Sequence, residues 1–136
     1  MTNHLANPRI PGGLALLAAA LLFVSPWALA FGGTAAASAW ILGALGALLG
    51  VKTFLRPESR AFLRAEPGDG WAIAVVGLLA GLMPWLAAFE GIPAALWSHE
   101  AAGLALVIGG VWYARASAPI GPAGAGTVVR SPSLEG

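Results

Sequence analysis

Four long apolar segments constrain the fold of this chain more than any other feature. The first, residues 12–31, has 20 residues, and a helix of that length rises about 30 Å, the thickness of the hydrocarbon core of a bilayer. Further apolar segments follow at residues 39–55, 71–89 and about 99–114. Charged residues make up only 10% of the chain, against about 25% in soluble domains. We therefore predict an all-α membrane protein with four transmembrane helices.

The basic residues indicate an orientation. They lie before the first apolar segment, around the centre of the chain and after the last segment: Arg9, Lys52, Arg56, Arg60, Arg64, Arg115 and Arg130. Because basic residues mark the cytoplasmic side, both termini are predicted to be cytoplasmic. The chain is predicted to consist of a cytoplasmic tail (1–11), a helical hairpin (12–55), a cytoplasmic loop (56–70), a second hairpin (71–114) and a flexible cytoplasmic tail (115–136).

The two hairpins share a sequence motif. "SPWALAFGG" at 25–33 returns as "MPWLAAFEG" at 83–91, with a spacing of 58, and the spacing becomes 60 at Ser38/Ser98 and Gly43/Gly103. The match predicts a tandem duplication with two extra residues in the outer loop of the second copy. A cleaved leader would have no reason to match an internal membrane segment, so we expect residues 12–31 to be a permanent helix although Ala-Leu-Ala at 28–30 looks like a cleavage site.

These motif residues resemble the SPW-repeat family of small prokaryotic membrane proteins. The residues that carry the resemblance are Ser25, Pro26, Trp27 and Phe31 in the first copy and Pro84, Trp85 and Phe89 in the second, where Met83 replaces the serine. The resemblance covers residues 12–114 and implies a fold of two-helix units in the prokaryotic inner membrane. It implies no activity, and no catalytic residue is carried over.

Each proline of the motif removes one backbone donor from its helix. The carbonyls of Leu22 and Ala80 thereby lose their helical partners, and in lipid such a group needs another one. We expect the adjacent tryptophans to pack across each hairpin and to cap the bundle at the interface. The alternative is a gate for a ligand.

Glycines four residues apart predict close helix contacts. Gly46 and Gly50 lie in the second segment, and Gly77 and Gly81 lie in the third. Such pairs let another helix approach closely, here between the two repeats or, alternatively, from another subunit. Ser38 and Ser98 are predicted to be N-caps of the second and fourth helices.

Titratable residues are expected only at the edges of the spans, with Glu90, His99 and Glu100 at the outer mouth and Lys52 at the inner edge. A lone interfacial histidine is expected to be solvated, although His99 with Glu100 could alternatively ligate a metal or a chlorin. The sequence has no cysteine and no Ser-His-Asp, HExxH or P-loop pattern, so we predict that the protein is not an enzyme.

The central loop carries Arg56, Arg60 and Arg64, each four residues from the next. They predict an interfacial helix that grips anionic lipids or an acidic partner surface; alternatively, they serve only to set the topology. A net charge of +1 excludes a strongly basic nucleic-acid binder.

Together these features favour a non-catalytic accessory or scaffolding subunit of a larger membrane complex, with an energy-transducing complex, photosynthetic or respiratory, as one candidate. The expected partners are other integral membrane subunits and anionic lipids. We predict no cofactor beyond bound lipid, with pigment contact if the complex is photosynthetic, and identify no soluble small-molecule substrate. The alternatives are a small oligomeric transporter or channel, and a cofactor- or pigment-binding protein that uses His99.

Overall fold

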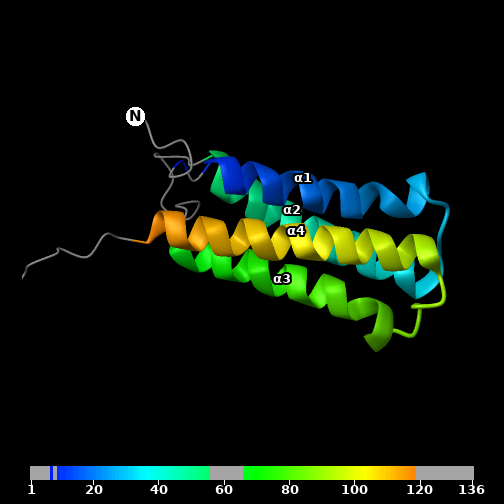
Figure 1. Cartoon of the computed structure of the whole chain (residues 1–136). Coiled ribbons are helices and arrows are strands. Elements are labelled where there is room, and N and C mark those ends of the chain that lie inside the picture. Colours follow the sequence, from blue (N-terminus) through cyan, green and yellow to red (C-terminus); the bar gives the residue numbers. More distant parts are fainter. Residues whose placement is uncertain (1–6, 8, 56–65, 119–136) are drawn as a thin grey trace, which may run out of the picture.

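The computed structural model describes residues 7, 9–55 and 66–118, and these residues form four helices that run side by side (Figure 1). The helices are α1 (Arg9–Ala28), α2 (Gly33–Leu55), α3 (Pro67–Leu86) and α4 (Pro93–Ser117). Each is long and apolar enough to cross a membrane. The chain is therefore an all-α, multi-pass membrane protein, as the sequence predicts.

The four helices are arranged as a ring of neighbours. α1 packs against α2 and α4, and α3 packs against α4 and α2. The connections at residues 29–32 and 87–92 lie together at one end of the bundle, which we call the loop end, and the chain enters α1 and leaves α4 at the opposite, terminal end (Figure 1). The fully buried interior consists mostly of small side chains, including Ala15, Ala19, Ala39, Ala80 and Ala95.

The helix boundaries differ from the predicted ones at the loop end. α2 begins at Gly33 and α4 at Pro93, where the sequence suggested loops that reach residues 38 and 98. Their first turns are rich in alanine, which is the strongest helix former. α1 and α3 end at Ala28 and Leu86, before the apolar segments end, because the backbone turns there while the composition stays apolar.

The turns after α1 and α3 have the same geometry. Ala30 and Ala88 adopt φ values of 53° and 54°, in the left-handed region where helices commonly end. The next amide in each turn, that of Phe31 or Phe89, donates to the carbonyl of the motif proline at 3.2 and 2.9 Å. Residues 87–92 exceed residues 29–32 by the two positions that the change in spacing predicts. The internal sequence match thus coincides with a match in backbone geometry.

Glycines let the two helices of each hairpin meet backbone to backbone. A Cβ atom on Gly43 would lie 2.7 Å from the amide nitrogen of Phe23, and one on Gly103 would lie 2.8 Å from that of Gly81. These two crossings occupy equivalent positions of the two motif copies. One heptad away, Gly50 approaches Leu16 and Gly110 approaches Ala74 in the same way. Only glycine permits such an approach.

The four glycines singled out by their spacing lie in different surroundings. Gly46 and Gly50 face α1, where added Cβ atoms would lie 3.0 Å from the Cβ of Ala19 and 2.8 Å from the Cα of Leu16. Gly77 faces α4, whereas a Cβ added to Gly81 would meet only the Oε1 of Glu100, at 4.0 Å. The tightest contacts therefore lie within each hairpin. The expectation that they lie between the two repeats was wrong.

Candidate functional site: a buried histidine between the motif turns

His99 lies inside the bundle near the loop end of α4, and none of its surface is exposed. Its Nδ1 lies 2.8 Å from the carbonyl oxygen of Ala95, one turn earlier. Its Nε2 lies 2.9 Å from the hydroxyl of Ser38 on α2. The imidazole thus links two helices that are not neighbours in the ring. The expectation of a solvated histidine at the outer mouth was wrong, because both ring nitrogens have partners within the bundle.

The two motif copies meet at this histidine. The ring centroids of Phe31 and Phe89 lie 6.4 and 4.9 Å from that of the imidazole. Both phenylalanines are buried, and each follows the left-handed residue of its turn. The imidazole therefore sits in an aromatic pocket to which both hairpins contribute one ring.

The hydrogen-bond partners restrict where the protons lie. A carbonyl oxygen only accepts, so the Nδ1 that faces Ala95 carries a hydrogen. In the neutral ring, Nε2 then accepts from the hydroxyl of Ser38. That hydroxyl oxygen also lies 2.9 Å from the carbonyl oxygen of Ala35. If the imidazole is charged, Nε2 donates to the hydroxyl of Ser38, and this hydroxyl donates to the carbonyl of Ala35. Both arrangements keep every polar atom of the pair bonded.

Ser38 and Ser98 do not cap their helices as predicted. Both lie one turn inside, and their hydroxyl oxygens lie 2.9 Å from the carbonyl oxygens of Ala35 and Ala95. α2 and α4 begin earlier than the apolar runs do, which moves both serines into helical positions. The repeat spacing of 60 residues could have indicated that His99 is buried, because it aligns His99 with Ala39 of the first copy. Both residues are fully buried.

The serine of the first motif copy supplies the partner that the proline removes. The hydroxyl of Ser25 donates to the carbonyl of Leu22 at 2.7 Å, which is the carbonyl that Pro26, having no N–H, leaves without a helical donor. In the second copy, Met83 has no hydroxyl to offer to Ala80. The serine and proline of the triplet thus act together: Pro26 removes the backbone hydrogen bond to the carbonyl of Leu22, and Ser25 replaces it.

A family model for the SPW repeat domain matches residues 9–113. The chain belongs to the SPW repeat family. No curated protein and no solved structure shows significant similarity to it. The match spans all four helices apart from the last turn of α4, so both SPW hairpins lie within the family's domain.

The tryptophans of the two SPW motifs have different neighbours. Trp27 is 62% exposed, and its ring lies 5.6 Å from that of Phe23 and 5.1 Å from that of Trp40 across the hairpin. Trp85 is 57% exposed, and the position equivalent to Trp40 is occupied by Glu100. Only the first SPW hairpin therefore carries an aromatic cluster over its crossing.

Glu100 occupies that place with a carboxylate. Its Oε1 is buried and has no hydrogen-bond partner among the described residues. A Cβ on Gly81 of α3 would lie 4.0 Å from this oxygen. The second SPW hairpin thus replaces Phe23 and Trp40 with a glycine and an acid.

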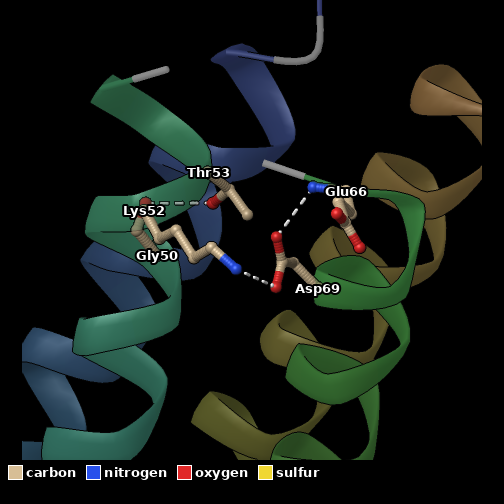
Figure 2. A network of polar contacts seen from close by, with 5 residues as sticks. All are labelled: Gly50, Lys52, Thr53, Glu66 and Asp69. Atoms are coloured by element: carbon tan, nitrogen blue, oxygen red, sulfur yellow. Dashed lines mark hydrogen bonds and ion pairs between the residues drawn. The ribbon is translucent and has the colours of Figure 1, made fainter. Parts of the chain in front are cut away.

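A polar contact joins the two SPW hairpins at the terminal end (Figure 2). The ammonium of Lys52 lies 2.8 Å from the Oδ1 of Asp69, and the amide of Glu66 donates to the Oδ2 of Asp69. Asp69 therefore caps α3 and pairs with α2 at the same time. Residues 66–70, predicted to be the end of the cytoplasmic loop (56–70), are instead the N-cap and first turn of α3, which begins at Pro67.

The remaining predicted contact residues, Arg56, Arg60 and Arg64, lie outside the described residues, as does the C-terminal segment from residue 119. Within residues 7, 9–55 and 66–118, no three His, Cys, Asp or Glu side chains come together as metal ligands would.

Proposed function

We propose that the protein is a non-catalytic accessory subunit of a larger membrane complex and that its lipid-facing surface binds transmembrane helices of other subunits. The observation that carries this proposal is an apolar groove of about 400 Å³ between α1 and α4. On α4 it is lined by small residues, namely Ser98, Ala101, Ala102 and Ala105, and on α1 by leucines that include Leu17 and Leu21.

A transmembrane helix suits this groove for a physical reason. Helices in lipid gain little from hydrophobic burial, so they associate where small residues permit close packing. The α4 lining repeats small residues at intervals of four, as such interfaces do. The bundle interior, by contrast, is already filled by close backbone contacts at glycines. Both ring nitrogens of the buried His99 have hydrogen-bond partners, which disfavours pigment or haem ligation through this residue.

The experiment is purification of the tagged protein from its native membrane in a mild detergent. We expect other integral membrane polypeptides to co-purify, including subunits that carry redox or pigment cofactors if the complex is energy-transducing. Ala101→Phe with Ala105→Phe fills the groove and should release them, whereas Leu48→Phe, on the exposed face of α2, should not. Recovery of the chain without membrane partners would refute the proposal.

The proposed orientation places both termini in the cytoplasm and the loop end outside. Single cysteines at the exposed positions Thr34 and Ile92 should react with an impermeant thiol reagent in intact cells, and cysteines at Glu66 and Ala118 should react only after lysis. The reverse pattern would overturn this orientation.

A further inference from the structure

Glu100 lies within a membrane-spanning helix, and its buried Oε1 has no hydrogen-bond partner among the described residues. It is the eighth residue of α4, which places it about 10 Å along the helix from the loop end at 1.5 Å per residue. Trp97, one turn earlier on α4, and Trp85, on α3, are exposed by 71% and 57%, and exposed tryptophans mark the level of the membrane interface. An ionisable group at this depth is costly unless it is paired.

Glu100 is partly exposed, although its Oε1 is buried. Gly81 leaves a recess on α3, since a Cβ there would meet nothing within 4 Å except the Oε1 of Glu100. Leu78, three residues before Gly81 on α3, and Leu104, four residues after Glu100 on α4, are exposed. In the first hairpin, the rings of Phe23 and Trp40 cover the equivalent place. The second hairpin therefore presents an acid at the bottom of an apolar recess.

A second copy of this chain brings none of its described lysine or arginine side chains to this place. Arg9, Lys52 and Arg115 lie at the terminal end of α1, α2 and α4. A copy in the same membrane orientation therefore presents them at the end opposite Glu100, so the cation is expected from a different molecule.

We infer that Glu100, beside Gly81, receives a lysine or arginine side chain from a transmembrane helix of a partner subunit. Such a side chain is long enough to reach the carboxylate from the lipid-facing side while its methylenes cover Leu78 and Leu104. The ion pair removes the cost of an unpaired carboxylate in an apolar surround. This inference rests on the proposed accessory role and deepens it by naming the chemistry of one contact, which is separate from the α1–α4 groove.

The first test compares Glu100→Gln with Glu90→Gln, which removes the same charge from an exposed residue of the nearby loop. Glu100→Gln should lower the recovery of the partner about tenfold, as loss of a charge-assisted hydrogen bond does, and Glu90→Gln should leave it unchanged. The melting temperature of the isolated chain should not fall in Glu100→Gln, because no contact within the chain is lost. Gly81→Leu, which keeps the acid and fills the recess, should also release the partner.

The second test places a photo-crosslinking amino acid at Trp85 in the native membrane. We expect the captured peptide to be a transmembrane segment of another protein with a lysine or arginine within one turn of the crosslink. Crosslinks to lipid alone, which would indicate an amine headgroup as the source of the cation, or to a second copy of the chain would overturn the inference. If the wild type retains its partners and Glu100→Gln retains them equally, this inference fails and the accessory role stands; if the wild type has no partners, both fail.

Discussion

The two hairpins cross at equivalent glycines, but different residues surround the two crossings. Phe23, Trp27 and Trp40 cover the first with ring contacts of 5.6 and 5.1 Å. The equivalent residues of the second are Gly81, Trp85 and Glu100. The backbone approach at Gly43 and Gly103 is the same to within 0.1 Å, at 2.7 and 2.8 Å. The crossing is therefore the feature that the two hairpins share, and the side chains around it can differ between them in size and charge.

The bundle interior shows the same contrast. Ala39 and His99 occupy equivalent, fully buried positions. A histidine is tolerated there because Ser38 of the other hairpin lies within 2.9 Å of its Nε2 and so satisfies a polar atom that would otherwise be costly to bury. One hairpin can thus acquire a buried polar group when the other offers the complementary one.

The largest expected effect tests whether the crossings are equivalent. Gly43→Ala and Gly103→Ala each bring a methyl group within 2.8 Å of backbone atoms, so each should lower the free energy of unfolding by about 3 kcal/mol. Gly81→Ala enters open space and should leave it unchanged or raise it by up to about 1 kcal/mol. Denaturant unfolding in detergent measures all three. Unequal losses at the two glycines would break the equivalence.

Removing the buried histidine should have the next largest effect. His99→Ala gives the second hairpin the residue of the first, and the cavity and lost hydrogen bonds should cost about 3 kcal/mol or slightly less. Ser38→Ala leaves Nε2 without its partner and should cost about 1 kcal/mol. Ser98→Ala, whose hydroxyl bonds only within its own helix, should change stability by less than about 0.5 kcal/mol. Equal effects of the two serine variants would contradict the bridging role of Ser38.

The Ser-Pro pair of the first hairpin permits a double-mutant cycle. Ser25→Ala should cost about 1 kcal/mol, because it takes the hydrogen bond from the Leu22 carbonyl. In a Pro26→Ala background, the new backbone N–H pairs with that carbonyl, and the same change should cost much less. The thermal stability of the four proteins in detergent gives the coupling between the two residues. Full additivity would show that Ser25 does not compensate for Pro26.

The smallest expected effect concerns the two turns. Ala30 and Ala88 adopt left-handed conformations that cost an alanine about 1 kcal/mol more than a glycine. Ala30→Gly and Ala88→Gly should each raise stability by no more than that amount, and by similar amounts in the two hairpins. A loss of stability at one site would show that the turns are held differently.

The sequence predicted the four spans because apolar runs long enough to cross a bilayer leave few other structures possible. It misplaced the ends of the helices at the loop end by up to six residues, since Gly33 to Ser38 looks like a polar-leaning loop and folds as the first turns of α2. The repeat spacing predicted the positions of the close helix contacts more accurately than composition predicted the ends of the helices. The pairs Gly43/Gly103 and Gly50/Gly110 lie at the close crossings, whereas a Cβ on Gly81, one of the glycines chosen for their spacing of four residues, would meet only the Oε1 of Glu100 at 4.0 Å.

The candidate site was harder to predict. His99 looked interfacial because the apolar run of the fourth segment begins after it, and the pairing with Ser38 depends on how the hairpins dock, which no local pattern records. The sequence identified the carbonyl of Leu22, freed by Pro26, as a group that needs a donor, but the prediction did not identify the hydroxyl of Ser25 as that donor. The unpartnered oxygen of Glu100 was not predictable, because its surroundings depend on how α3 and α4 pack and on the open side that Gly81 leaves.

The division of contacts also has a consequence for how the protein is made. The tight crossings lie within each hairpin, whereas the bonds from Ser38 to His99 and from Lys52 to Asp69 join one hairpin to the other. Residues 9–55 can therefore complete their crossing while the second half is still being synthesised, with the hydroxyl of Ser38 bonded to the carbonyl of Ala35 until the imidazole arrives. Assembly then proceeds from finished halves, and two polypeptides divided between α2 and α3 and produced in the same cell should combine into a stable bundle.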